Sequence, residues 1–303
     1  MKRGLVFSGG GSRGSYQVGV WKALDELNIK CDIAVGTSIG SVNAALYTQN
    51  SLDLAIKLWQ KININTVFKE DKLSLRMTPS NFKDILSNII DYSKIIDSNI
   101  NYGLVTCKFP KIKKLEIDKT KLSSENIVDY LIASCTVYPV FKATKIDKKR
   151  YVDGGFREPI PINLAKKLGA DELIIVNISA LKPNYKPKDN INCIYIKHYG
   201  KLKSPLKFDS ETAKRNLIYG YNDTMKVYNK YYGKKYTFKE NYDEIKILEF
   251  IGKYFDIDDT KVYTKKQFNK IIVSNNYTIE KYGKKKSLSY KANEYIEKIK
   301  SVC

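Results

Sequence analysis

Short apolar runs alternate with amphipathic stretches along the first two thirds of the chain. Strands are predicted at the apolar runs 2–7, 32–35, 104–107, 114–117, 151–152, 172–178 and 192–197, the last two being continuous as in parallel sheets. Helices are predicted at 15–27, 39–49, 124–135 and 161–168, and amphipathic helices of a more variable insert at 52–62 and 82–90. This alternation predicts an α/β fold, a three-layer αβα arrangement around a mainly parallel central sheet.

The pattern changes after residue 200. Helical periodicity dominates there, at 210–231, 242–255, 264–273 and 290–301, with no strong strand in between. No repeat and no low-complexity linker separates the two parts. We therefore predict an α/β core over residues 1–200 and a helical C-terminal extension over 201–303 that packs on the core.

Three glycine-containing segments each follow a predicted strand. The first runs from Gly9 through Gly10, Gly11, Ser12 and Arg13 to Gly14; the second is Gly36-Thr37-Ser38-Ile39-Gly40; the third is Asp153-Gly154-Gly155. The second has the G-x-S-x-G form of a nucleophile elbow, in which Gly36 and Gly40 avoid clashes with neighbouring backbone. Such a turn exposes Ser38 at a helix N-terminus, where amide groups favour a developing oxyanion. A glycine-rich strand-to-helix turn that is merely capped by a serine has the same sequence.

The first segment has two interpretations. Gly9-x-Gly11-x-x-Gly14 matches the dinucleotide-binding fingerprint, which requires an acidic residue at the end of the second strand. Asp32 lies instead at the start of that strand. Alternatively, the bare amides of the glycines form an oxyanion hole.

A nucleophilic serine needs a base, and the chain offers two. His198 is the only histidine, and the order Ser38, Asp153, His198 fits a Ser–His–Asp triad. However, in the α/β-hydrolase fold, which has this order, the elbow usually follows several strands, whereas here it follows the second strand. His198 also ends a strand, where a half-buried polar residue is an ordinary finding. Asp153, with glycines after it that allow close approach of the backbone, is the better candidate for a direct hydrogen bond to Ser38.

These motifs together resemble the patatin-like phospholipase family. G-G-G-x-R-G, G-x-S-x-G and D-G-G occur in the family's order, residues 133–141 (ASCTVYPVF) resemble its A-S-x-x-x-P-x-x-F stretch, and Pro161 follows the D-G-G segment. The resemblance covers about residues 4–180. Gly155 stands where the family often has alanine, and the helical region beyond about residue 205 has no motif to match.

The resemblance implies a Ser–Asp dyad. Ser38 would attack an ester carbonyl, Asp153 would act as the general base, and the amides of Gly9, Gly10 and Gly11 would hold the oxyanion. Arg13 would steady the glycine loop or meet a phosphate group; an ordinary surface arginine is the alternative. Gly14, Gly36, Gly40, Gly154 and Gly155 would be the supporting glycines.

The strongly positive charge of the chain bears on whether it binds lipid surfaces or nucleic acid. The formal net charge is +21, spread along a chain rich in Lys, Asn, Ile and Tyr, as an AT-rich genome produces. The alternative is that the charge serves adsorption to anionic lipid, with Lys284, Lys285 and Lys286 as one exposed cluster. We find no clustered arginine or recognition motif for nucleic acid.

The expected function is hydrolysis of fatty-acyl esters of phospholipids or other glycerolipids through an acyl-enzyme. No metal or organic cofactor is implied, and the five cysteines form no C-x-x-C pair. Without a leader or an apolar run of about 20 residues, the expected location is the cytoplasm, peripheral at a membrane surface. Alternatives are acyl transfer or thioester hydrolysis with the same dyad, Rossmann-like nucleotide binding, and a catalytically silent lipid-binding protein.

Overall fold

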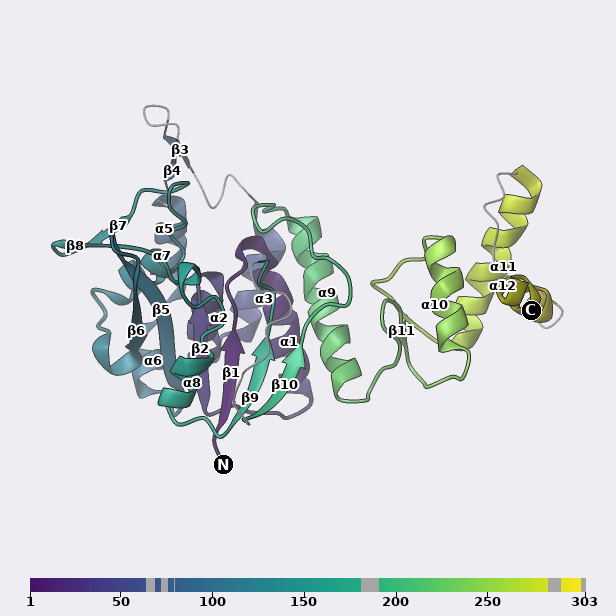
Figure 1. The fold of residues 1–303 in the computed structure, drawn as a ribbon, viewed down its shortest axis with the longest axis horizontal. Helices are drawn as coiled ribbons and strands as arrows, with labels where there is room; N and C mark the ends of the chain where they lie inside the picture. The colour runs from purple at the N-terminus through teal and green to yellow at the C-terminus, as the bar shows by residue number, and fades with distance from the viewer. Residues whose placement is uncertain (64–68, 72–75, 79, 181–190, 283–289, 301–303) are drawn as a thin grey trace. The chain divides into compact units, whose positions relative to one another are not determined.

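A computed structural model describes residues 1–63, 69–71, 76–78, 80–180, 191–282 and 290–300 of the chain (Figure 1). Lys284, Lys285 and Lys286 therefore lie outside the described residues. The described residues divide into two compact units, Met1–Tyr221 and Asn222–Cys303.

The first unit is built around an eight-stranded sheet. Its strand order is β10-β9-β1-β2-β5-β8-β7, with β6 paired to β5. The pairs from β10 to β5 are parallel, whereas β6, β7 and β8 run antiparallel to their neighbours. The strands are β1 (Arg3–Phe7), β2 (Ile33–Thr37), β5 (Asn101–Phe109), β6 (Lys113–Asp118), β7 (Thr144–Ile146), β8 (Lys149–Asp153), β9 (Glu172–Val176) and β10 (Asn192–Ile196).

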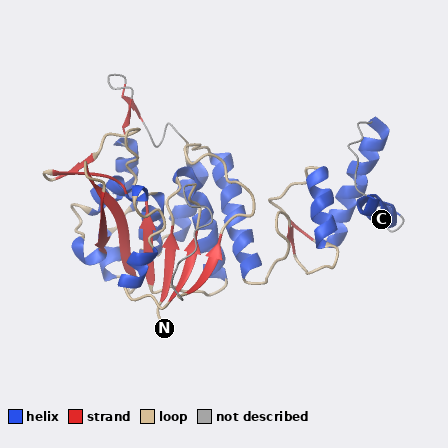
Figure 2. Ribbon diagram, viewed as in Figure 1, coloured by secondary structure: helices blue, strands red, loops and turns tan. Residues whose placement is uncertain are grey.

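Helices cover both faces of this sheet (Figure 2). On one face, α8 (Ile162–Lys167) packs with alternate residues of the central strands, such as Val6 and Val35. On the other face, α2 (Ile39–Thr48) contacts β1, β2 and β5. The other helices of this unit are α1 (Gly14–Glu26), α3 (Leu52–Lys61), α5 (Ser80–Ile89), α6 (Tyr92–Asp97), α7 (Ile127–Ser134) and α9 (Ser210–Val227), which continues into the second unit; β3 (Lys69–Asp71) and β4 (Arg76–Thr78) form a small hairpin. The predicted α/β class with a mainly parallel, two-sided sheet is confirmed.

Two strands meet end to end along one edge of β5. β6 pairs with β5 from Gly103 to Lys108, so β2 and β8 share the opposite edge. On that edge, Thr37 at the end of β2 lies opposite Val105, and Asp153 at the end of β8 lies opposite the next residue, Thr106. Since β2 and β8 run in opposite directions, their carboxyl ends converge. This topology brings the second and third glycine segments together.

The second unit has an apolar core of its own. Phe268 lies at its centre, with edge-on ring contacts to Tyr236, Phe238 and Tyr263. Its elements include α10 (Ile245–Tyr254), α11 (Lys265–Tyr282), α12 (Tyr290–Lys300) and the short parallel strands β11 (Thr237–Phe238) and β12 (Val262–Tyr263). Mostly helical structure was predicted here, whereas this pair of strands was not.

The boundary between the units falls within α9, whereas the sequence predicts a domain boundary at residue 200. Gly19 of α1 lies so close to α9 that a Cβ there would come within 2.0 Å of the carbonyl oxygen of Leu217, and a Cβ at Gly220 would come equally close to the carbonyl of Tyr16. The middle of α9, around Leu217 and Gly220, is thus packed backbone to backbone on α1 of the α/β core. That the later residues pack on the core as an extension stays a prediction.

Candidate active site

Ser38 occupies a strained turn between β2 and α2. Its φ of 54° and ψ of −134° lie in a region that a non-glycine residue rarely adopts. The flanking glycines make the turn possible: a Cβ on Gly36 would come within 2.1 Å of the backbone of Gly40, and a Cβ on Gly40 within 2.4 Å of the carbonyl oxygen of Phe7. The geometry is that of a nucleophile elbow.

Hydrogen bonds hold the backbone of the elbow in this conformation. The amide of Ser38 donates to Ser134 Oγ at 2.9 Å, and Ser134 Oγ donates in turn to the carbonyl of Val105 at 2.7 Å. Ser41 Oγ donates to the carbonyl of Ser38 at 2.6 Å. The nucleophile candidate is therefore fixed by α7 on one side and by its own helix on the other.

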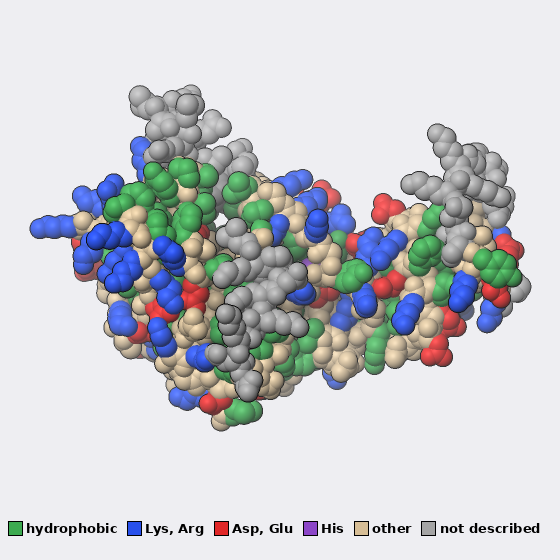
Figure 3. Space-filling model, in the orientation of Figure 1, with side chains coloured by type: hydrophobic (Ala, Val, Ile, Leu, Met, Phe, Trp, Pro, Cys, Tyr) green, Lys and Arg blue, Asp and Glu red, His purple; other side chains and the backbone are tan. Residues whose placement is uncertain are grey.

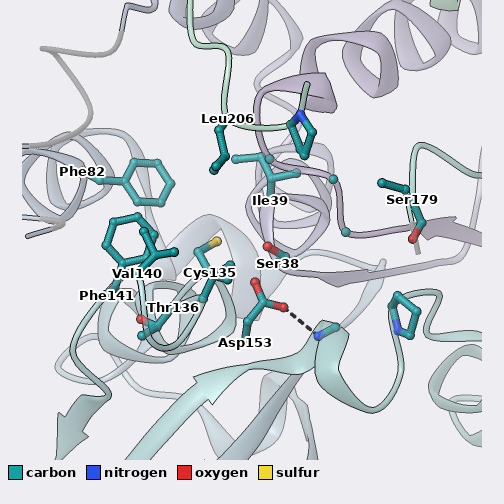
Figure 4. A pocket seen from close by; sticks show the side chains of 18 of the residues that line it. Ser38, Ile39, Phe82, Cys135, Thr136, Val140, Phe141, Asp153, Ser179 and Leu206 are labelled. Atoms are coloured by element: carbon teal, nitrogen blue, oxygen red, sulfur yellow. Dashed lines mark hydrogen bonds between the residues drawn. The ribbon is translucent and has the colours of Figure 1, made fainter. Parts of the chain in front are cut away.

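Asp153 ends β8 beside this elbow. The Ser38 hydroxyl points toward the Asp153 carboxylate (Figure 4), and only 5% of Asp153 is exposed. Burial raises the pKa of the carboxyl to about 6, while hydrogen bonds from the Ser38 side chain and from the Gly155 amide, the latter at 2.6 Å, act in the opposite direction. A carboxylate with a raised pKa next to a hydroxyl is equipped to accept its proton near neutral pH.

The glycines after Asp153 permit its close approach. A Cβ on Gly154 would come within 2.3 Å of the carbonyl oxygen of Val105, and a Cβ on Gly155 within 2.9 Å of Asp153 Oδ1. The second contact is with the far end of a carboxylate, which can shift. Gly154 is therefore the stricter requirement of the two.

The glycine loop between β1 and α1 borders the same space. Gly9 donates its amide to the carbonyl of Pro159 at 2.8 Å, so this amide is already occupied. Gly11 has a φ of +56°, and a Cβ there would come within 2.2 Å of the carbonyl oxygen of Pro205. The expectation that all three glycine amides serve an oxyanion therefore narrows to Gly10 and Gly11.

Arg13 ties the glycine loop to a segment distant in sequence. Its guanidinium donates to the carbonyls of Lys203, Ile178 and Leu202 at 2.7, 3.2 and 3.2 Å. Ser12 adds two hydrogen bonds to this segment. Its amide donates to the carbonyl of Pro205, and its hydroxyl donates to the carbonyl of Ser204. These contacts favour the loop-steadying role of Arg13 over the phosphate contact.

We expect Arg13→Lys to raise KM similarly for a neutral short-chain ester and for a phospholipid. Lysine cannot reproduce the forked set of guanidinium donors, so the segment at 202–205 loosens, at a cost of about 2 kcal/mol of stability. Because Pro205 lines the cavity above Ser38, substrate binding weakens as well. Steady-state kinetics on both substrates and urea unfolding measure these effects. A KM increase confined to the phospholipid would show that Arg13 contacts phosphate instead.

A mainly apolar cavity of about 340 Å³ opens above Ser38 and Asp153. Phe82 of α5, the neighbouring Val140 and Phe141 of the loop after α7, and Leu206 before α9 project into it (Figure 4). Its remaining apolar lining includes Ile39, Ile62, Ile132, Val137, Phe156, Pro205 and Phe208. The site thus joins a buried hydroxyl–carboxylate pair to a space that suits an aliphatic chain.

Other candidates from the sequence lie elsewhere or have other contacts. His198 stacks on Tyr219 with ring centroids 4.3 Å apart and is not among the residues that line the cavity. Cys135 does line it, and burial raises its pKa well above the usual value, so its thiol stays protonated. Asp32 accepts a hydrogen bond from the amide of Arg3 at the amino end of β2, away from the glycine loop. It is therefore not placed to hold a ribose.

Sequence reasoning missed two contributors to the site. Ser134 belongs to the A-S-x-x-x-P-x-x-F stretch, but that motif indicates no role for it. The segment from Pro205 to Phe208, of which Pro205, Leu206 and Phe208 line the cavity, falls within the predicted helical extension. Its one sequence signal was a proline in a stretch between predicted elements.

Metal ligands, disulfides and membrane-spanning helices were sought among the described residues. Within the described part of the chain, no group of three or more His, Cys, Asp or Glu side chains is arranged to hold a metal ion. The described cysteines, Cys31, Cys107, Cys135 and Cys193, are free thiols. Among the helices in the described ranges, none is long and apolar enough to cross a bilayer.

The fold and the site define an α/β protein with a serine elbow and an aspartate at the end of an apolar cavity. Residues 5–166 match the family model described as patatin-like phospholipase, and the chain belongs to that family. The resemblance read from the motifs is thereby confirmed.

Curated relatives carry this region within much longer proteins. Lysophospholipase nte1 of Aspergillus terreus is 29% identical over 189 residues, which are 60% of this chain and 12% of that protein. The human patatin-like phospholipase domain-containing protein 6 is 28% identical over 188 residues, 58% of this chain and 13% of that protein. The matched part of this chain therefore corresponds to about an eighth of each relative's length.

Among solved structures, VipD from Legionella pneumophila has a similar fold. The TM-score is 0.56 at 14% sequence identity, and the match covers 92% of this chain and 75% of that chain. At this identity the likeness concerns the fold alone.

Proposed function

We propose that this chain hydrolyses fatty-acyl esters of glycerophospholipids or related glycerolipids through an acyl-enzyme on Ser38. The single observation that carries the proposal is the convergence of Ser38 and the buried Asp153 at the base of an apolar cavity. Membership of the patatin-like phospholipase family and relatives named as lysophospholipases support the substrate class.

Each part of the site has a step in this reaction. Asp153 accepts the hydroxyl proton as Ser38 Oγ attacks the ester carbonyl, and the amides of Gly10 and Gly11 stabilise the oxyanion. Collapse of the tetrahedral intermediate breaks the bond to the alkoxy oxygen, which takes the proton from Asp153 and leaves as an alcohol. A water molecule then gives its proton to Asp153 and attacks the acyl group, and the fatty acid is released as Ser38 recovers its proton.

The cavity explains why the acyl portion would be recognised. Each methylene transferred from water into such a lining contributes about 0.8 kcal/mol, so a chain of several carbons outweighs the polar contacts of a head group. No charged side chain other than Asp153 lines the cavity, as far as the described residues go. Selectivity for acyl length is therefore expected to exceed selectivity for the head group.

Mass spectrometry of a mixed glycerolipid pool before and after incubation with the protein tests the proposal. We expect free fatty acids and the matching deacylated lipids to appear in equal amounts. Acylated products in place of free fatty acid would indicate acyl transfer, and an unchanged pool would indicate a catalytically silent lipid-binding protein.

A further inference from the structure

Exposed apolar side chains surround the mouth of the cavity. Residues 137–140 are exposed in succession, with Val137 38%, Tyr138 36% and Val140 38% accessible, and Val137 and Val140 also line the cavity. Phe156 and Leu206, likewise part of the lining, are 46% and 55% exposed. Thus the apolar lining continues outward onto the surface instead of ending in a polar rim.

This segment is held firmly at both of its ends. The carbonyl of Thr136 accepts the amide of Asp153 at 2.8 Å, and its hydroxyl bonds Thr144 Oγ1 at 2.6 Å. Phe141 at the other end is buried, and its amide donates to the carbonyl of Val137 at 3.0 Å. The exposed side chains are therefore presented by an anchored loop that is tied directly to the catalytic aspartate candidate.

A basic hairpin begins immediately after this loop. β7 and β8 project from the first unit (Figure 1), and Lys and Arg side chains gather over them beside a hydrophobic area (Figure 3). Across 142–150 and the adjoining 108–113 turn, Asp147 is the only acidic residue. The exposed cations of these two segments are Lys108, Lys111, Lys113, Lys142, Lys145, Lys148, Lys149 and Arg150.

Ring contacts join the basic hairpin to the apolar loop. The guanidinium of Arg150 lies 5.2 Å from the centre of the Phe109 ring, and that ring lies 4.9 Å from the ring of Tyr138. Phe109 and Arg150 are also paired in the sheet. The cations and the exposed apolar residues therefore form one continuous surface next to the cavity mouth.

We propose that this surface, the 137–140 loop together with the β7–β8 hairpin, is the site at which the protein adsorbs to an anionic lipid surface. The cations would lie against anionic head groups while Val137, Tyr138 and Val140 enter the acyl boundary. Adsorption in this orientation would bring the mouth of the cavity to the lipid from which an acyl chain is drawn. The choice of a lipid partner rests on the proposed function.

Vesicle co-sedimentation in the Ser38→Ala background tests the surface separately from the chemistry. The probes are vesicles of phosphatidylcholine alone and of phosphatidylcholine mixed with phosphatidylglycerol. The test variant carries Lys145→Gln, Lys148→Gln and Lys149→Gln, none of which lines the cavity. The matched control carries Lys2→Gln, Lys22→Gln and Lys30→Gln, exposed lysines on β1 and α1 or their flanks, away from the hairpin.

We expect the hairpin variant to bind the anionic vesicles about a hundredfold more weakly, since each cation near such a surface contributes about fivefold. The control variant should bind as the parent does, and raising salt from about 0.1 to 1 M should abolish the difference because the Debye length falls from roughly 10 to 3 Å. Tyr138→Ser should weaken binding to the same vesicles by about tenfold. Equal losses in the hairpin and control variants, or no loss in either, overturn the proposal.

The two proposals can fail independently. With Ser38 intact, the hairpin variant should keep its full rate on a soluble short-chain ester. If the Ser38→Ala protein adsorbs as expected while the parent hydrolyses no lipid, the surface stands and the proposed function fails. If the parent hydrolyses a soluble ester but does not adsorb to anionic vesicles, the ester-hydrolysing site stands and the proposed adsorption surface fails.

Discussion

Replacement of Ser38 by alanine is expected to lower the rate of hydrolysis of a p-nitrophenyl ester by at least about four orders of magnitude. The hydroxyl is the atom that would form the acyl-enzyme, and the Cys135 thiol, which also lines the cavity, is held protonated by burial. The oxyanion donors would remain and account for any residual rate. Release of p-nitrophenol measures the effect.

Two controls make this result specific. Ser124→Ala removes the hydroxyl of an exposed serine outside the cavity lining and should leave the rate unchanged. Circular dichroism should show that Ser38→Ala folds normally, because alanine removes one oxygen from a turn held by backbone contacts. Activity of Ser38→Ala within tenfold of the parent would eliminate the acyl-enzyme mechanism.

The parts of the site that could be predicted from sequence are those encoded locally. Gly36 and Gly40 flank Ser38 within five residues, and the steric demand of a sharp turn is readable at that range. The same holds for the strands around it, since short apolar runs between glycine turns are typical of buried parallel strands. Local motifs were therefore enough to single out Ser38 and Asp153 as candidates.

What could not be predicted depends on long-range contacts. Ser134 supports Ser38 across 96 positions, and Arg13 reaches Lys203 across 190. The Gly9 amide is occupied by Pro159, a partner that no pattern near Gly9 suggests. Likewise, the β7–β8 hairpin carries more polar than apolar residues, so its first strand gave no hydrophobic signal. In each case the missing information was which distant segment would lie alongside.

Asp153→Asn is expected to lower esterase activity by at least about two orders of magnitude, the low end for a lost general base. His198→Ala, whose ring packs against Tyr16 and Tyr219, should keep most of its activity. The parent's kcat/KM should fall as pH drops through about 6, because the protonated Asp153 cannot accept a proton. If the histidine variant lost more activity than the aspartate variant, the Ser–His–Asp triad would be the correct mechanism.

The Asp153→Asn substitution is also expected to stabilise the fold at neutral pH. The pKa of Asp153 is raised from 3.8 to about 6 by burial, so the folded state holds this proton more tightly than the unfolded state does. Stability is therefore lost as pH rises from about 4 to about 6, and the cost at pH 7 is about 3 kcal/mol. Asparagine does not titrate and can still accept the Gly155 amide.

Urea unfolding of the parent and of Asp153→Asn at two pH values measures this cost directly. Near pH 7 the variant should be the more stable protein, by up to about 3 kcal/mol, and near pH 4 the difference should disappear. Comparison at each pH cancels the titration of all other groups, which the two proteins share. A variant less stable than the parent at pH 7 would mean that the ionised carboxylate is held by stronger contacts than the Gly155 amide and the Ser38 hydroxyl provide. Greater stability together with lost activity would instead show that burial of this carboxylate, which costs the fold stability, is what makes it a base near neutral pH.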